Sequence, residues 1–469
     1  MVVQHNLRAM NSNRMLGITQ GTLSKSAEKL SSGYKVNRAA DDAAGLSISE
    51  KMRKQIRGLS QASLNAEDGI SSVQTAEGAL TEVHDMLQRM NELATKAANG
   101  TNALSDRQTI QDEVGQLLTE IDRVAETTKF NETYLLKGDT DTVLKKVSAH
   151  DAGLEGTLRE GELTATFTMN KLALGDKVSI AGQEYTIGST AADVQASFTK
   201  LSANFKGGEL VTVDSVQYTV AKGATAANAD KNILSDTDIL AKIKAAGNSF
   251  TYNGVKHVAM VDAGNDGVDD TDATIITDQH AYDLIQQELT LANNIGTDKS
   301  TVANVAKVAA GTANAKDATK MDFVITKGSQ KVKEDLNFSL HVGADADMTN
   351  KISVKIASMD TAGLGIKGLN VADSTGASAT YAIDAIADAV SKVSAQRSLL
   401  GAVQNRLEHT INNLDNVVEN TTAAESQIRD TDMATEMVKY SNANILSQAG
   451  QSMLAQGNQS NQGVLSLLG

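Results

Sequence analysis

The chain has 469 residues, a formal net charge of −14, and neither proline nor cysteine. The absence of cysteine excludes disulfides, thiolate metal ligands and cysteine nucleophiles. The negative charge argues against nonspecific binding to nucleic acid or to an anionic membrane. Because proline removes a backbone donor and breaks helices, a chain without it can form very long ones.

The first residues contain no recognisable secretory signal. Such a signal needs a basic start and then about 7–15 apolar residues, and residues 1–14 never sustain an apolar run. No stretch approaches the ~18 apolar residues of a membrane-spanning helix. We expect no membrane insertion, and a chain that stays in the cytoplasm or leaves the cell without a cleaved signal.

Both ends of the chain carry regularly spaced apolar residues, and no acidic residue precedes Glu28. Residues 6–32 carry apolar side chains seven apart, and residues 441–469 contain no Asp, Glu, Lys or Arg. Uncharged amphipathic helices have little stability of their own in water and a face to bury. The candidates for assembly contacts are Leu16, Leu23, Leu30, Ile445, Leu446, Met453 and Leu467.

Two explanations remain open for these apolar ends. They could dock on the rest of their own chain, or they could associate with identical subunits. A head-to-tail contact that does not close into a ring produces a helical filament. We favour assembly, because one face is then buried repeatedly.

Three long segments have the apolar spacing of packed helices. Between residues 46 and 100 the spacing alternates between three and four from Val73 to Ala97, as in a coiled coil. A second helix should follow a capping box at residues 105–108 and run to about Thr127. A third should span Ile383 to Thr421. The simplest way to bury these faces is an elongated antiparallel bundle formed by both chain ends.

The middle of the chain is different in kind. Short alternating runs at residues 177–187, 210–220 and 250–258 predict β-hairpins. Each is followed by a segment with helical character, at residues 191–201, 236–245 and 279–292. The predicted fold class is therefore mainly α with an α+β insertion, in which hairpins and short helices form a central, variable outer domain.

The sequence suggests five segments. Residues 1–40 and 436–469 are the expected assembly helices, and residues 41–140 and 381–435 are the expected halves of the bundle. Residues 141–380 are the expected outer α+β part.

The sequence contains no catalytic or metal-binding motif that we could support. Residues 363–368 match G-x-G-x-x-G but lack the strand–turn–helix context of a dinucleotide site. The acidic stretch 262–272 fails the spacing of a calcium loop. The seven histidines form no ligand pattern. We expect no enzyme activity and no cofactor.

Several ordered blocks resemble bacterial flagellin closely. They lie at residues 30–46, 52–59, 65–70 and 74–80, and at residues 405–414 and 419–433. The similarity covers about the first 140 and the last 90 residues. One departure is Gly457, where the family usually has alanine.

The resemblance implies a structural subunit that polymerises into the extracellular flagellar filament for motility. It also implies export by a type III path, with the terminal helices in the filament core and the middle domain outside. The implied partners are further copies of the chain, hook-junction and cap proteins, and an export chaperone at the C-terminal region.

One recognition site follows from the resemblance residue by residue. Flagellins detected by the innate receptor Toll-like receptor 5 present Q-R-x-x-E-L, which reads Gln88 to Leu93 here. The implied receptor contacts are Arg89, Glu92, Leu93 and Glu113. We expect Arg89 and Leu93 to share a helix face away from the apolar seam. The alternative is a solvated strip whose charges pair along the helix, for instance Glu92 with Lys96.

Two other kinds of protein are alternatives to a filament subunit. Some flagellins carry a metalloprotease in the middle domain, but its H-E-x-x-H motif is absent here. A junction protein with flagellin-like ends, which joins the hook to the filament, is the nearer alternative.

Overall fold

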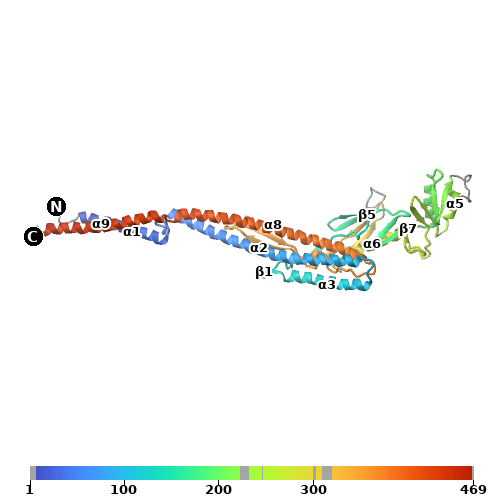
Figure 1. Ribbon diagram of the computed structural model, residues 1–469, viewed down its shortest axis with the longest axis horizontal. Helices are drawn as coiled ribbons and strands as arrows, with labels where there is room; N and C mark the ends of the chain where they lie inside the picture. The colour runs from blue at the N-terminus through green and yellow to red at the C-terminus, as the bar shows by residue number, and fades with distance from the viewer. Residues whose placement is uncertain (1–6, 222–231, 246, 299–302, 309–318, 467–469) are drawn as a thin grey trace. The chain divides into compact units, whose positions relative to one another are not determined.

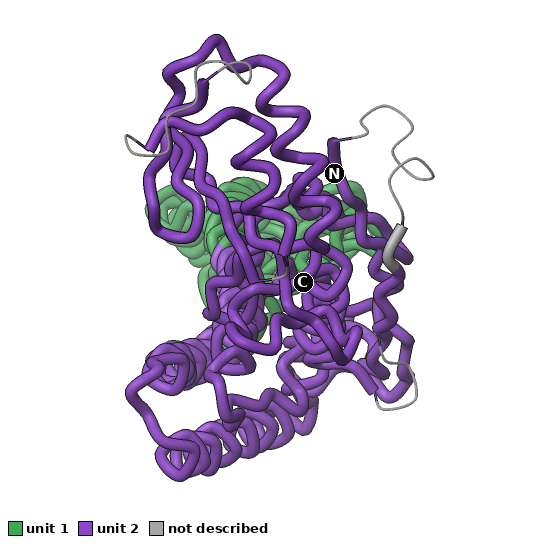
Figure 2. Tube along the Cα trace, turned by 90° about the vertical axis from the view of Figure 1, so that its right-hand side faces the viewer, with its two compact units in different colours: residues 1–71, 338–354, 402–469 green, residues 72–337, 355–401 purple. Residues whose placement is uncertain are grey.

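The computed structural model describes residues 7–221, 232–245, 247–298, 303–308 and 319–466, without the side chains of 307, 308 and 460–466. The chain forms two compact units, drawn in two colours in Figure 2. Unit 1 comprises Met1–Ser71, Phe338–Val354 and Ala402–Gly469, and unit 2 comprises Ser72–Asn337 and Lys355–Gly401. Each unit is described by itself below.

Unit 1 contains the two terminal helices and parts of two longer ones. Helices α1 (Leu7–Ser32) and α9 (Met433–Ser466) lie side by side (Figure 1). The first part of α2 (Ala43–Ala98) packs antiparallel to the last part of α8 (Ala377–Arg429). Bridging residues Tyr34 and Asp430 pair as a short antiparallel contact between the two chain segments.

Serine hydroxyls set the pairing of α2 with α8 in unit 1. Ser49 donates to Glu425 at 2.8 Å, and Ser63 donates to Asp415 at 3.3 Å. The partner number falls as the serine number rises, so the two helices run in opposite directions. Such buried polar pairs disfavour a shifted register, because a slip would leave a buried hydroxyl without its partner.

A β-ribbon covers one side of the helices in unit 1. Strands β17 (Leu336–His341) and β18 (Lys351–Ile356) pair with each other. Val342 and Ile352 of this ribbon region join Ala66 and Leu407 in one buried cluster. The ribbon was not predicted, since its apolar alternation is short and interrupted.

In unit 2 the predicted seam of α2 is buried throughout. Its eight members are each at most 1% exposed: Val73, Ala76, Leu80, Val83, Leu87, Met90, Ala94 and Ala97. Helix α3 (Leu104–Thr127) buries Ile110, Val114 and Ile121. Arg397 of α8 donates to Glu77 of α2 at 2.7 Å. The expected packing of three helical seams is therefore present.

The start of α3 differs from the prediction. The residue before the helix is Ala103, not Ser105, and its side chain has no acceptor. The carboxylate of Asp106 accepts the backbone N–H of Ala103 at 3.3 Å, which satisfies one free donor of the first turn. Ser105 lies inside the helix, so the predicted Ser105–Gln108 capping box is wrong.

A buried arginine holds the connection between α2 and α3. Arg107 is 2% exposed, and its guanidinium donates only to backbone carbonyl oxygens. The acceptors belong to Ala97, Asn99, Asp373, Ser374 and Thr375, at 2.9 to 3.4 Å. Two of these carbonyls close the C-terminal end of α2, where a cation is favourable. Sequence patterns gave no sign of this contact.

The central part of unit 2 has two separate cores. A four-stranded sheet, in the order β14-β15-β5-β4, packs with α6 (Asp278–Asn293) around Phe167, Phe323 and Tyr282. A five-stranded sheet, in the order β10-β9-β8-β11-β12, packs with α4 (Ala191–Ser202) and α5 (Asp236–Lys242). The aromatic rings of Phe198 and Phe250 meet edge to face in this second core.

The three predicted hairpins and the helices after them are present. The hairpins are β6 (Lys177–Ile180) with β7 (Gln183–Ile187), β8 (Leu210–Val213) with β9 (Val216–Ala221), and β11 (Ser249–Tyr252) with β12 (Val255–Val258). Asp214 and Ser215 have positive φ, as a two-residue hairpin turn requires. The mainly α fold with an α+β insertion is thereby confirmed.

The strands that pair over long sequence distances were not predicted. β5 runs antiparallel to β15 with Phe167 opposite Phe323. The remaining elements are β1 (Lys129–Phe130), β2 (Thr133–Tyr134), β3 (Thr142–Lys146), β4 (Thr157–Glu160), β5 (Thr164–Asn170), β10 (Ile233–Ser235), β13 (Ile275–Ile276), β14 (Asn304–Val308), β15 (Lys320–Thr326), β16 (Ser329–Lys333) and α7 (Thr361–Leu364).

Candidate functional site

The terminal helix pair, α1 with α9, is joined by a buried polar contact. The hydroxyl of Ser26 donates to Glu436 at 2.7 Å, and Lys439 donates to the other carboxylate oxygen at 3.0 Å. Both Ser26 and Glu436 are buried. The hydrogen bond from Ser26 lowers the pKa of Glu436, burial opposes this, and Lys439 adds to the lowering.

The predicted assembly residues of α1 and those of α9 differ in their exposure to water. Leu16, Leu23 and Leu30 of α1 are half-buried, and Leu16 lies close to Gly450 of α9. On α9, by contrast, the apolar side chains point outward: Ile445 is 63% exposed, Leu446 60% and Met453 60%. Leu467 lies outside the described residues.

The terminal helix pair also forms a shallow apolar groove of about 620 Å³. Its lining comes from both helices: Ala27, Leu30, Met433, Ala434, Met437 and Tyr440. Met433 and Met437 are more than half exposed. These two methionines precede the uncharged segment 441–469. The absence of charge in the sequence therefore did not indicate that they belong to the exposed surface. Large exposed apolar areas of this kind are typical of interaction surfaces.

The receptor candidates gather on α2 and α3 within unit 2. Arg89 Nε and Nη2 donate to Glu113 Oε1 at 3.0 and 2.9 Å, and Nη1 donates to Glu92 Oε2 at 3.1 Å. All three side chains are about half exposed or more. The hydrogen bonds that Arg89 donates to Glu113 and, with a smaller effect, to Glu92 raise the pKa of Arg89, so the guanidinium is firmly charged. Glu92 thus pairs along the helix with Arg89.

The expected position of Leu93 is wrong. Its side chain is only 3% exposed, so it does not share the outer face with Arg89. Leu93 lies three residues after Met90, and α3 covers this side of α2. The buried face of α2 is therefore wider than the seam predicted from Val73 to Ala97, whose members alternate three and four residues apart. Leu93 lines a groove of about 530 Å³ between the two helices, together with Arg89, Glu92 and Glu113.

Local structure accounts for the two remaining motifs, the G-x-G-x-x-G match at residues 363–368 and the acidic stretch 262–272. Within residues 363–368, Gly363 belongs to the short helix α7, and Asp360 caps that helix. In the acidic stretch, Asp262 and Asp269 accept backbone N–H groups of their own loop. Among the described residues, no three His, Cys, Asp or Glu side chains are grouped as they would be around a metal ion.

Comparison with known proteins identifies the helical ends. Residues 3–141 match the family model of the bacterial flagellin N-terminal helical region, and residues 383–468 match that of the C-terminal helical region. The chain is 38% identical to flagellin of Clostridium tyrobutyricum, over 98% of this chain and 100% of that protein. It is 33% identical to flagellin of Halalkalibacterium halodurans over the whole of both chains. The chain belongs to the bacterial flagellin family.

Membership in the flagellin family makes this chain a structural subunit of the flagellar filament, outside the cell. Among solved structures, FliC from Burkholderia pseudomallei matches with 19% identity and a TM-score of 0.24, over 72% of this chain and 99% of that one. A TM-score this low supports no argument from that structure. No helix in the described part of this flagellin is long and apolar enough to span a membrane.

Proposed function

We propose that this flagellin polymerises through its terminal helix pair, with residues 1–40 and 436–469 in the filament core. The observation that supports this most strongly is the exposure of Ile445, Leu446 and Met453 on a helix pair that is already formed. Covering water-exposed apolar side chains on the charge-free part of α9 with a neighbouring subunit lowers the free energy of the assembly. The half-buried Leu16, Leu23 and Leu30 hold α1 against α9 and complete the surface.

A charge placed on this surface tests the proposal. Leu446→Asp would bury a carboxylate between subunits, so we expect the critical concentration for polymerisation to rise at least about tenfold. The matched control is Gln448→Asp, which adds the same charge at an exposed polar position of the same helix. Electron microscopy and sedimentation of seeded protein measure the outcome. Normal filaments from Leu446→Asp would contradict the proposal, as would rings or monomers from the unaltered chain.

Further partners belong to the same proposal. Residues 41–140 and 381–435 are the proposed inner shell, and residues 141–380 are the proposed outer part. Export without a cleaved signal, a chaperone at the C-terminal region, and contacts with hook-junction and cap proteins follow from the flagellin resemblance. The apolar groove lined by Met433 and Met437 supports a partner for the unassembled chain.

We also propose that Toll-like receptor 5 recognises the cluster of Arg89, Glu92 and Glu113, with Leu93 supporting it from the groove beneath. The specific support is that Glu92 and Glu113 hold the guanidinium of Arg89 in one position while leaving it about half exposed. An arginine ordered before binding loses less conformational entropy in the complex. Arginines of this kind often contribute most of the affinity of an interface.

Replacement of the arginine tests receptor recognition. Arg89→Ala should weaken binding of the receptor ectodomain at least about tenfold and reduce the response of a receptor reporter cell line. Arg123→Ala is the control, because Arg123 is equally exposed and pairs with Glu120 three residues away. Unchanged binding by Arg89→Ala would contradict the proposal, and so would an equal loss in Arg123→Ala.

A further inference from the structure

A hollow of about 360 Å³ lies within unit 2, away from both surfaces described above. Its walls are the end of β3, strand β16, residues 357–365 with the short helix α7, and one side of α8. The volume is at the lower end of the range found for small-molecule sites. Most of the lining is apolar and includes Val147, Val332, Met359 and Leu399.

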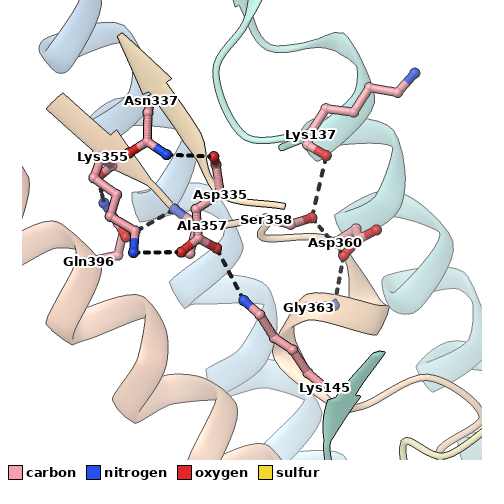
Figure 3. A network of polar contacts seen from close by, with 10 residues as sticks. All are labelled: Lys137, Lys145, Asp335, Asn337, Lys355, Ala357, Ser358, Asp360, Gly363 and Gln396. Atoms are coloured by element: carbon pink, nitrogen blue, oxygen red, sulfur yellow. Dashed lines mark hydrogen bonds and ion pairs between the residues drawn. The ribbon is translucent and has the colours of Figure 1, made fainter. Parts of the chain in front are cut away.

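Most polar side chains that line the hollow already have a protein partner. Figure 3 shows three of them: Lys145 donates to Asp335 at 3.1 Å, Ser358 donates to Asp360 at 3.0 Å, and Gln396 donates to the carbonyl of Lys355 at 3.0 Å. The side-chain oxygen of Gln396 also accepts the N–H of Ala357. These groups are therefore fixed in place and belong to the wall.

Gln330 is the exception. It is 1% exposed, and neither its side-chain oxygen nor its side-chain nitrogen has a hydrogen-bond partner. A buried amide without partners costs about 1–3 kcal/mol, and the large majority of buried side-chain polar atoms in proteins have one. Gln330 and Val332 lie on the same side of β16, and both line the hollow. The missing partner of this amide is thus to be sought in the hollow.

The charged side chains that line the hollow are all lysines. Its lining includes Lys145, Lys146 and Lys392, and none of the described lining residues is acidic. Lys146 and Lys392 donate to the carbonyl oxygens of Lys327 and Leu364, at 3.0 and 2.9 Å. A carbonyl oxygen satisfies a donor but carries no full negative charge to pair with the ammonium group.

Lys392 is the cation best placed to attract an anion. The residue as a whole is exposed, and its ammonium group donates to the carbonyl oxygen of Leu364 at 2.9 Å. Burial lowers the pKa of Lys392, and the nearby Asp388 opposes this. An anion beside the ammonium would stabilise its charged form further.

We propose that this hollow binds a small organic carboxylate whose apolar part contacts Val147, Val332 and Met359. The carboxylate pairs with the ammonium of Lys392 and accepts from the amide nitrogen of Gln330. Such charge-assisted hydrogen bonds are about twice as strong as neutral ones. The ligand is a free small molecule, and a carboxylate side chain of a neighbouring subunit is the competing source.

Equilibrium dialysis of the full-length chain with labelled hexanoate tests the site. We expect one saturable site per chain, occupied more weakly by hexanamide and not at all by hexylamine. Lys392→Gln and Gln330→Leu should each weaken hexanoate binding at least about tenfold. Lys331→Gln, which removes an exposed lysine from the same strand, should change it less than about twofold. Circular dichroism checks that each variant is folded, and the hexanoate–hexanamide comparison needs no variant.

Three results would overturn the proposal. The first is the absence of saturable hexanoate binding by the unaltered chain. The second is hexanoate binding by Lys392→Gln and by Gln330→Leu that is as tight as binding by the unaltered chain. A trapped water would then be the only partner left for Gln330. The third is binding to the monomer that disappears in filaments, since a neighbouring subunit would then fill the hollow.

Discussion

Ser26 and Glu436 form a buried hydroxyl–carboxylate contact between α1 and α9. Around this contact the two helices meet through half-buried leucines. Because these side chains are all alike, they do little to fix the register of α1 on α9. A hydrogen bond to a charged group contributes about 1.5–3 kcal/mol and needs both partners at one place. We infer that this pair fixes the register of α1 on α9, as Ser49 and Ser63 do for α2 on α8.

The contact predicts a pH dependence of the terminal helix pair. The pKa of Glu436 is lower in the folded chain than its usual 4.5, so its stabilisation is fully present above that unfolded value. The stabilisation is lost as the pH falls through the lower, folded pKa. We expect thermal unfolding of the helix pair, followed by circular dichroism, to be insensitive to this group above about pH 5 and to weaken below pH 4.5.

Glu436→Gln is the matched control for this pH dependence. It cannot ionise, so its profile should be flatter across the same acidic range and its stability lower at neutral pH. Ser26→Ala should shrink the difference between acid and neutral conditions. Identical profiles for the unaltered chain and Glu436→Gln would show that another group controls the transition.

At the scale of elements, two helical glycines have opposite roles. Gly58 of α2 lies against the loop between β17 and β18, where an added Cβ would stand 2.9 Å from the Cβ of Ala344 and 3.1 Å from its Cα. A side chain cannot be accommodated there without moving the backbone. Around Gly457 of α9, nothing lies within 4 Å of such a Cβ. Helix propensity alone would favour alanine at both positions.

We therefore predict opposite effects of the same substitution. Gly457→Ala should stabilise α9 by about 1 kcal/mol, because glycine has the larger backbone entropy to lose. Gly58→Ala should destabilise unit 1 by about 1–3 kcal/mol, because overpacking outweighs propensity. Urea unfolding followed by circular dichroism measures both. A stabilised Gly58→Ala variant would mean that the β17–β18 ribbon is not held against α2.

At the scale of the whole molecule, the proposed assembly surface belongs to one compact unit and the two central cores belong to the other. Unit 1 carries the exposed apolar helix α9, whereas unit 2 has its own buried seam on α2, two further cores and the buried clamp at Arg107. None of the contacts in unit 2 described above involves residues 441–469. Loss of that segment should therefore leave unit 2 intact.

A truncated chain without residues 441–469 tests this separation. We expect it to be soluble, to keep the unfolding transition of unit 2, and to form no filaments at concentrations where the full chain polymerises. Sedimentation and electron microscopy measure assembly, and circular dichroism measures folding. Filaments of normal appearance from the truncated chain would refute the role of the terminal segment in assembly.

The sequence by itself determined the local structure of this protein. Helical seams, two-residue hairpin turns and charge-free ends are read from neighbours a few positions apart, because side-chain direction repeats every 3.6 residues in a helix and every two in a strand. Those patterns located α2, α3 and α8 and the three hairpins. The resemblance to flagellin, and not these patterns, pointed to Arg89, Glu92 and Glu113, which the fold brings together.

Only the tertiary structure decided which positions are covered by a second or third segment. Leu93 is buried because α3 packs beside it, Arg107 binds carbonyls more than 260 positions away, and Gln330 is enclosed beside α8. The pairing of β5 with β15 joins strands about 150 residues apart. Such contacts depend on where distant segments meet, and apolar periodicity carries no information about that partner.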